Sequence, residues 1–229
     1  MDAFHTFTTH MDWGGLLNFL LTIVGVLLCL TVHEVSHGLA AYALGDPTAK
    51  RQRRLSLNPL RHLDPIGTLM MLVASFGWAR PVPVDMRYFR HPKLGMSVTA
   101  LAGPVSNFIL AYLVLLVRAA VIPFYELSGN AVLGELIVFC VRIAVLSIGL
   151  GLFNLIPIPP LDGSKILESV LPDRVYYVIL RYEQVGMLAL MVLLWTGVLS
   201  GPLYDARSWC LSTMSSGTIW LYDLIWSLL

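Results

Sequence analysis

The chain of 229 residues is strongly apolar, with 57% hydrophobic residues and only 13% charged residues. Its mean hydropathy is +0.74 and its formal net charge is +1 at pH 7. Because soluble domains usually carry about 25% charged residues, this composition excludes an ordinary soluble domain and favours an integral membrane protein. A net charge near zero also argues against nucleic acid as a partner. The three cysteines, Cys29, Cys140 and Cys210, are too widely spaced to indicate a disulfide framework or a cysteine-ligated metal.

Apolar segments of membrane length recur along the chain. Four predicted spans cover roughly Gly14–Leu44, Gly95–Val121, Val132–Ile156 and Val185–Leu199. The run Ile66–Trp78 is short for a crossing and is predicted as a short or re-entrant segment. Residues 205–229 suit either a last span or an interfacial helix. We expect a single domain over residues 1–229, with a core over about 14–172, folded as an all-α polytopic membrane protein with about 5–6 membrane segments.

Basic residues gather in the loops after the first predicted span and before the second. By the positive-inside rule these loops are cytosolic, which places the N-terminus outside, and we expect the plasma membrane as the location. The Arg51–Arg54 cluster has the alternative role of binding anionic lipid or nucleic acid. The basic loop residues are Lys50, Arg51, Arg53, Arg54, Arg61, Arg80, Arg87, Arg90 and Lys93.

An HExxH motif, His33-Glu34-Val35-Ser36-His37, lies inside the first apolar segment. In a helix, residues i and i+4 share a face, so His33 and His37 would present two imidazoles to one point. Neutral imidazole is a good zinc ligand, and Glu34 would act as general base toward a water activated by the metal. The alternative is a pair of core histidines that are hydrogen-bonded across helices.

A third metal ligand is expected from the sequence Asn154–Gly163, at the end of a predicted span. Three prolines between residues 157 and 160 cannot continue a helix, and irregular backbone at membrane depth is tolerated where it lines a wet cavity. Asp162 would complete the ligand set, and the Asn154 amide would stabilise an oxyanion. The alternative role of Asp162 is to cap a helix over residues 164–171.

These motifs together resemble the site-2 protease family of intramembrane zinc metalloproteases, peptidase family M50. Besides HExxH and the NxxPxPxxDG pattern at 154–163, the segment Leu57–Gly67 and the GPxxN element at 103–107 are similar to that family. The resemblance implies one Zn²⁺ per chain, held by His33, His37 and Asp162. It also implies Glu34 as the catalytic base and Asn154 as the oxyanion partner. The length is typical of the compact form of the family, without PDZ or CBS domains.

Two further polar residues near these motifs each have two alternative roles. Asn107 is predicted either to support the active site or to form hydrogen bonds between packed helices. His62 follows the first span in a basic loop, where a surface or packing role is favoured over metal binding.

The sequence Arg80-Pro81-Val82-Pro83-Val84-Asp85 has the pattern of an edge strand. Both prolines lack N–H groups on one edge, whereas Val82 and Val84 keep theirs on the other edge. In the family this region looks like a membrane-associated β-element near the active site. We therefore expect a short β-element here, and we hypothesise that Val82 and Val84 bind an extended substrate. The alternative is a structural turn.

The favoured function is zinc-dependent hydrolysis of peptide bonds within or next to transmembrane helices. The partners would be a transmembrane protein or peptide and the lipid bilayer, with the active site toward the cytosolic half. A metal transporter is one alternative, but Gly38 follows His37 where a second carboxylate would be needed. A di-iron oxidase would require repeated ExxH motifs, and Glu34–His37 is the single instance here. A non-catalytic membrane scaffold is the third alternative.

Overall fold

The computed structural model describes residues 13–65, 67, 80–172 and 182–229. The regular secondary structure of the described residues is helical, as predicted for an all-α membrane protein, and these ranges contain no β-strand. The helices are α2 (Trp13–Ala43), α3 (Thr48–Arg51), η1 (Pro59–Arg61), η2 (Met86–Tyr88), α5 (Pro92–Ser128), α6 (Ala131–Asn154), α7 (Asp162–Val170), α9 (Glu183–Trp195), α10 (Ser200–Ser216) and α11 (Ile219–Trp226).

Three helices are long and apolar enough to cross a membrane, namely α2, α5 and α6. Their composition leaves few polar side chains to face lipid, and each helix satisfies its backbone hydrogen bonds internally, as a bilayer requires. The helix α5 ends where Gly129 adopts the left-handed conformation with φ of 62°. The start of α6 is capped by Asn130, whose side chain accepts a hydrogen bond from the Val132 N–H. The chain is therefore an integral membrane protein.

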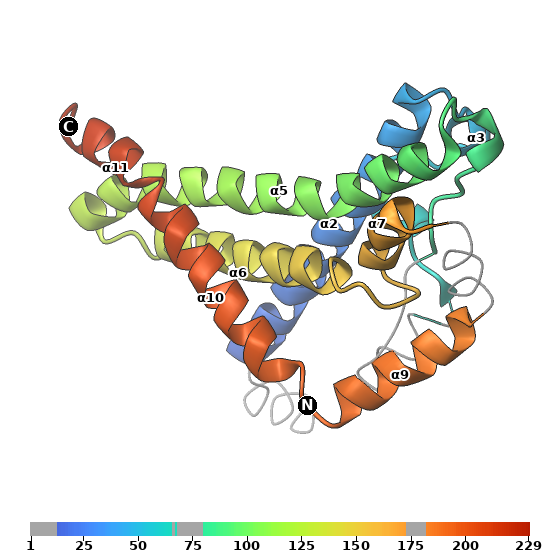
Figure 1. The fold of residues 1–229 in the computed structure, drawn as a ribbon. Helices are drawn as coiled ribbons and strands as arrows, with labels where there is room; N and C mark the ends of the chain where they lie inside the picture. Colours follow the sequence, from blue (N-terminus) through green and yellow to red (C-terminus); the bar gives the residue numbers. More distant parts are fainter. Residues whose placement is uncertain (1–12, 66, 68–79, 173–181) are drawn as a thin grey trace, which may run out of the picture.

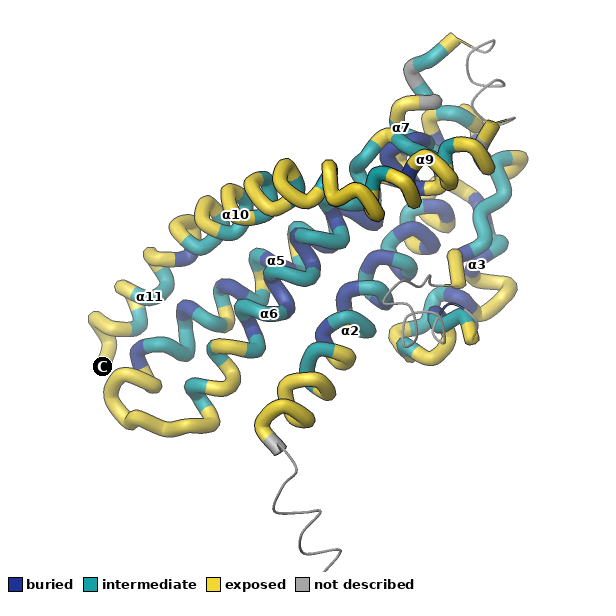
Figure 2. Tube along the Cα trace, turned by 90° about the horizontal axis from the view of Figure 1, so that it is seen from below, coloured by how far each residue is buried: buried dark blue, intermediate teal, exposed yellow. Residues whose placement is uncertain are grey.

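The helices α5 and α6 lie side by side, and α2 crosses them (Figure 1). Their contact is built from small and branched residues that are fully buried: Ala111 and Leu115 on α5, and Ala144 and Ile148 on α6. Small side chains let two helix backbones approach closely, which is the usual basis of helix association in membranes. In Figure 2 the buried parts of α2, α5 and α6 face one another, and the exposed parts of each helix face outward.

The predicted count of about 5–6 membrane segments is not borne out by the described residues. The predicted span Val185–Leu199 is the short helix α9, which turns through 81° into the helix pair α10–α11. Gly197, with φ of 70°, lies at this bend and is well suited to it, because glycine tolerates a positive φ. Counting the bent pair as one span gives at most four spans. The predicted segment Ile66–Trp78 lies outside the described residues except for Gly67.

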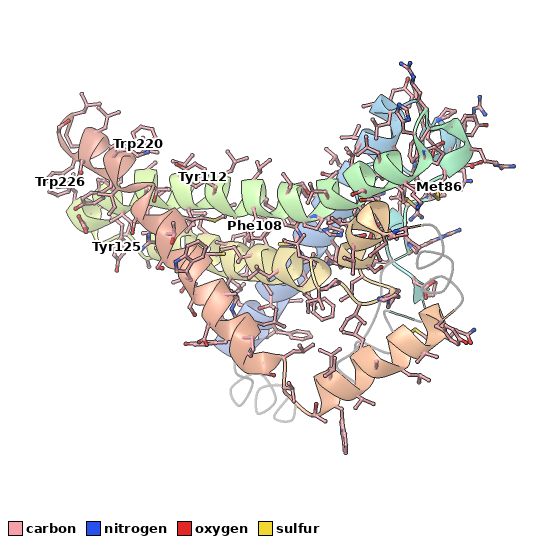
Figure 3. The ribbon with its side chains drawn as sticks, viewed as in Figure 1. Met86, Phe108, Tyr112, Tyr125, Trp220 and Trp226 are labelled. Carbon is pink, nitrogen blue, oxygen red and sulfur yellow. The ribbon has the colours of Figure 1, made fainter. Side chains whose placement is uncertain are left out.

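The C-terminal residues 205–229, predicted as a span or an interfacial helix, belong to α10 and α11, which lie along α6 and α5 respectively. Two tyrosine hydroxyl groups form hydrogen bonds between α5 and this C-terminal part. The Tyr112 hydroxyl donates to the Gly217 carbonyl at 3.1 Å, and the Tyr222 hydroxyl donates to Glu126 at 3.0 Å. Figure 3 shows Tyr125, Trp220 and Trp226 gathered at this end of the molecule. Such aromatic residues typically mark the boundary between lipid and water.

The predicted β-element over Arg80–Asp85 is wrong for the described residues, because this segment forms no strand. Side chains hold its two ends where a neighbouring strand would otherwise pair. The guanidinium of Arg54 is buried and donates to the carbonyls of the first two residues at 2.6 and 3.3 Å. The carboxylate of Asp46, also buried, accepts the Asp85 N–H at 2.7 Å. The segment is thus anchored by buried charged groups, together with a backbone hydrogen bond from the Arg80 N–H to the His62 carbonyl at 2.8 Å.

We predict that Ala111→Leu will destabilise the bundle, because the added methyl groups have no room between α5 and α6. The free energy of unfolding, measured by SDS titration in mixed micelles, should fall by about 1–3 kcal/mol. The control is Val117→Leu on the same helix, where the side chain is 48% exposed and a larger group faces outward. Equal stability of Ala111→Leu and wild type would contradict this packing.

Candidate metal centre

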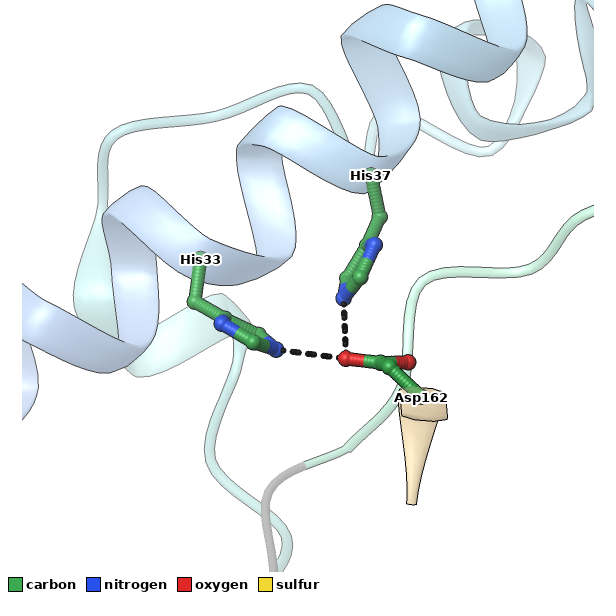
Figure 4. Close-up of side chains that lie close together, drawn as sticks. All are labelled: His33, His37 and Asp162. Atoms are coloured by element: carbon green, nitrogen blue, oxygen red, sulfur yellow. Dashed lines mark hydrogen bonds and ion pairs between the residues drawn. The ribbon is translucent and has the colours of Figure 1, made fainter. Parts of the chain in front are cut away.

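The two histidines of the HExxH motif project from the same face of α2 (Figure 4). They lie one turn apart, with ring centroids 4.6 Å apart and ring planes at 88° to each other. His33 is 4% exposed and His37 is 9% exposed. Each ring turns its Nε2 atom toward Asp162, at 3.1 Å from the same carboxylate oxygen. The i, i+4 spacing therefore brings the two imidazoles to one point, as predicted.

Asp162 reaches the histidines from a sharp turn between α6 and α7. Between these helices the chain runs through a proline-rich loop, and Asp162 is the first residue of α7. Gly163 packs directly on the carbonyl oxygens of Leu155 and Ile156, so any side chain at this position would collide with them. The carboxylate of Asp162 faces the histidines, which disfavours its alternative role as a helix cap. A residue 129 positions from His33 in the sequence thereby becomes its neighbour.

These three residues form the one group among the described residues that could hold a metal ion, with ligand atoms within 4.8 Å of one another. Tetrahedral zinc ligands about 2.1 Å from the ion would lie about 3.4 Å apart, close to the two observed separations of 3.1 Å. Burial would raise the pKa of the Asp162 carboxyl, but hydrogen bonds from both imidazoles outweigh it and hold that pKa well below its usual value. Two neutral imidazoles and an ionised carboxylate are a ligand set that suits zinc.

Glu34 lies beside the ligand group, but its carboxylate is already hydrogen-bonded. Its Oε2 atom accepts the backbone N–H of Val82 at 2.9 Å. This bond corrects the expectation that the N–H groups of Val82 and Val84 would both be free at one edge. The segment that follows Arg80 therefore contacts the metal centre through the glutamate of the HExxH motif.

One cavity of about 760 Å³ contains the ligand group and most of the predicted site residues. Its lining includes Glu34, Asn154, Val82 and Val84 beside the three ligands. The amide of Asn154 donates to the Leu150 carbonyl at 3.0 Å, so its donor group is engaged within its own helix. The opposite wall is apolar and is formed largely by α9, through Met187, Leu190, Met191 and Leu194.

Asn107 lies against the metal centre on α5 and is fully buried. Its Nδ2 atom is 3.2 Å from the Nδ1 atom of His33. On the second histidine, Nδ1 of His37 is 2.7 Å from the Thr99 carbonyl oxygen. Both ligand rings are thus held from behind by α5, the first by a side chain and the second by the backbone. The sequence suggested Asn107, whereas nothing in it singled out the Thr99 carbonyl.

Two other residues lie at the site: Gly103, which the sequence indicated only as part of the GPxxN element, and Lys165, which was not predicted. Gly103 on α5 lies so close to the ligands that a Cβ atom there would be 2.5 Å from His37 Nε2 and 2.7 Å from His33 Cε1. Lys165 lines the cavity, with its Nζ atom 3.7 Å from the second oxygen of Asp162. The sequence could have indicated this contact, because Lys165 follows Asp162 by about one helical turn and such residues share a helix face. His62, expected to pack, is buried and its Nε2 lies 2.7 Å from the Ser56 carbonyl oxygen.

The comparison with known proteins identifies the family. The profile of peptidase family M50 matches residues 118–197, which carry Asn154 and Asp162. YwhC of Bacillus subtilis (strain 168), named as a candidate zinc metalloprotease, is 41% identical over 172 residues, which are 75% of this chain and 78% of that protein. The chain belongs to peptidase family M50. The resemblance that the motifs indicated is confirmed.

Other relatives in the M50 family carry the same description. Rip2 of Mycolicibacterium smegmatis, also named as a candidate zinc metalloprotease, is 32% identical over 198 residues, covering 83% of this chain and 73% of that protein. Rip2 of Mycobacterium tuberculosis (strain H37Rv) is 29% identical over 195 residues, with the same coverage. No solved structure is significantly similar to this chain. The metal in the relatives' names is the one that this ligand set suits, in agreement with the Zn²⁺ predicted from the sequence.

We predict that Gly103→Ala will weaken zinc binding at least about tenfold, because the added methyl group intrudes on both ligand imidazoles. Zinc affinity can be measured in detergent by competition with a chromogenic chelator. Gly201→Ala is the matched control, since Gly201 is also helical and a Cβ atom there meets nothing within 4 Å. Unchanged zinc affinity in Gly103→Ala would contradict the close approach of α5 to the metal centre.

Proposed function

We propose that this M50 protein is a zinc-dependent intramembrane endopeptidase. It would hydrolyse peptide bonds within or next to transmembrane helices of membrane-protein substrates. The observation that carries this proposal is that three ligand atoms and Glu34 meet in one cavity. The two histidines and Glu34 lie on α2, which is long and apolar enough to cross the bilayer. A hydrolytic centre needs a Lewis acid, a base and room for a peptide, and this cavity supplies a place for each.

Each site residue has a specific part in the proposed reaction. His33, His37 and Asp162 would hold the zinc ion, which when bound polarises a peptide carbonyl and acidifies a water. Glu34 would accept a proton from the attacking water and pass it to the nitrogen of the departing amine. The Val82 N–H donates to the Oε2 atom of Glu34, and the second carboxylate oxygen, Oε1, would act on the water.

Asn154 is proposed to donate a hydrogen bond to the oxyanion that forms during attack. Its place in the cavity lining supports this role. One N–H of its amide donates to the Leu150 carbonyl, and the second N–H is the one that would meet the oxyanion. Amide donors that meet developing negative charge in a site shielded from water typically contribute about 10²–10³ in rate.

The substrate is proposed to bind as an extended chain beside Val82 and Val84. A helical substrate hides its carbonyl groups in its own hydrogen bonds, so the scissile bond must be unwound before hydrolysis. Both valines line the cavity, and the backbone N–H of Val82 contacts Glu34. The apolar wall that α9 provides would accept hydrophobic side chains of such a segment.

We further propose that the protein lies in the plasma membrane with its N-terminus outside and the metal centre toward the cytosolic half. The support is the positive-inside rule together with exposed basic residues in α3 and just after it, among them Lys50, Arg51 and Arg53. The transporter alternative would require further ligands along a path, and the described residues contain a single ligand group. The scaffold alternative gives no reason for a complete set of ligands and base.

We predict that Glu34→Gln will retain zinc and lose activity. Removing a general base typically lowers the rate by about 10²–10⁴. The measurements are zinc per chain and the cleavage rate of a membrane-spanning peptide in detergent. Glu135→Gln on α6, where the side chain is exposed, is the control. Equal activity of Glu34→Gln and wild type, or metal transport without cleavage, would overturn the proposed function.

We predict that Val84→Pro will lower kcat/KM for a transmembrane peptide by about three- to tenfold, because proline removes one N–H available to an extended substrate. Zinc content should not change. Val84 is the better test position, since the Val82 N–H already serves Glu34. Val84→Ala, which keeps the N–H, is the control. An equal loss in both variants would mean that the side chain and not the backbone contacts the substrate.

A further inference from the structure

Each histidine of the metal centre has a second ring nitrogen that must also find a partner. With both Nε2 atoms directed at Asp162, the Nδ1 atoms face α5. The Nδ1 atom of His37 meets the Thr99 carbonyl oxygen, which can only accept a hydrogen bond. With a metal at Nε2, this ring would carry its proton on Nδ1, because the carbonyl oxygen accepts that proton and leaves the Nε2 lone pair for the metal. The backbone alone fixes the tautomer of His37.

The Nδ1 atom of His33 meets a group that can both donate and accept. The Asn107 side chain is fully buried, with its Nδ2 atom 3.2 Å from Nδ1. Its other terminal atom, Oδ1, is a buried acceptor with no hydrogen-bond partner. In this arrangement Asn107 donates to His33, which leaves the proton of His33 on Nε2, where it faces Asp162. That tautomer suits a metal-free site but not a metal-bound one.

Metal binding by His33 requires the opposite tautomer, because a ligand Nε2 must offer its lone pair. The proton then sits on Nδ1 and needs an acceptor. A half-turn of the Asn107 amide exchanges its oxygen and nitrogen without changing the shape of the side chain. The turn brings the unpartnered Oδ1 against Nδ1, where it accepts the new N–H. An amide, which carries both a donor and an acceptor, can thus serve either tautomer from a single position.

The surrounding helix holds Asn107 in reach of His33. Its backbone carbonyl accepts the hydroxyl of Ser147 on α6 at 2.8 Å, and Ser147 is itself fully buried. Gly103 lies one turn earlier on the same face of α5 and lets the helix approach the two imidazoles. The spacing of Gly103 and Asn107 thus combines a close approach with a polar group at the point of contact.

We propose that Asn107 is a positioning residue for zinc: its amide oxygen accepts the Nδ1–H of His33 and so presents the Nε2 lone pair to the metal. The inference rests on the proposed zinc centre. Partners of this kind orient a ligand imidazole and increase its basicity, and their removal typically weakens metal binding about 10–100-fold. The role differs from that of Glu34, because Asn107 acts through His33 and not on the reacting atoms.

The competing role for Asn107 is packing alone, as a polar contact between α5 and its neighbours. Two variants of similar size separate these roles. Asn107→Leu fills the space but can neither donate nor accept. Asn107→Asp can only accept, which is what the metal-bound tautomer of His33 requires, and a carboxylate is a common partner of zinc-bound histidine. If packing were the whole role, a buried carboxylate should be at least as harmful as leucine.

The test is zinc affinity in detergent by chelator competition, together with the rise in melting temperature that zinc produces. Asn107→Leu should bind zinc about 10–100-fold more weakly and show a smaller rise, whereas Asn107→Asp should stay within about threefold of wild type or bind more tightly. Ser147→Ala, which loses a hydrogen bond to the backbone of Asn107 and spares the amide, is the packing control. It should bind zinc as wild type does.

Equal losses in the two Asn107 variants, no loss in Asn107→Leu, or a similar loss in Ser147→Ala would overturn the inference. If Asn107→Leu does not fold, the preserved affinity of Asn107→Asp is compared with Asn107→Ala, which also lacks an acceptor. Wild-type protein that binds no zinc would instead overturn the metal centre itself. Zinc binding that is normal in every variant would leave the proposed function standing and remove only the role of Asn107.

Discussion

Two imidazoles and a carboxylate meet in the buried interior, and much of the fold follows from keeping them together. Removing such groups from water is costly unless each finds a partner. His33 and His37 find theirs in Asp162 on one side and in α5 on the other. The proline-rich turn after α6 exists at this depth because it lines a cavity and delivers the carboxylate. The three main helices are therefore arranged around one small polar cluster.

The local parts of this arrangement could be predicted from the sequence, and the long-range parts could not. His33 and His37 share a face because helix geometry alone dictates it, and Asp162 was identified because prolines interrupt an apolar segment beside it. The bend between α9 and α10 was missed, since hydrophobicity does not distinguish a straight helix from one that turns at Gly197. The bond between Glu34 and Val82 joins residues 48 positions apart, so no local pattern carries it.

The expected β-element shows how a correct pattern can lead to a wrong element. Pro81 and Pro83 do restrict pairing along Arg80–Asp85, as the sequence indicated, yet the described residues contain no strand there. Buried charged side chains provide the missing partners, with Arg54 binding carbonyl groups at one end and Asp46 binding an N–H at the other. Long polar side chains from other elements can substitute for a strand, and a sequence read by itself does not reveal which of the two solutions the fold uses.

The hydrogen bond between Glu34 and Val82 also couples two events at the centre. One N–H cannot serve two acceptors fully, so a peptide carbonyl that bound the Val82 N–H would displace the carboxylate. Binding of a substrate carbonyl to the Val82 N–H and release of the Glu34 Oε2 atom would then be one linked equilibrium, in which each favours the other to the same extent. A single backbone N–H, that of Val82, would thus link the docking of a substrate to the proposed general base.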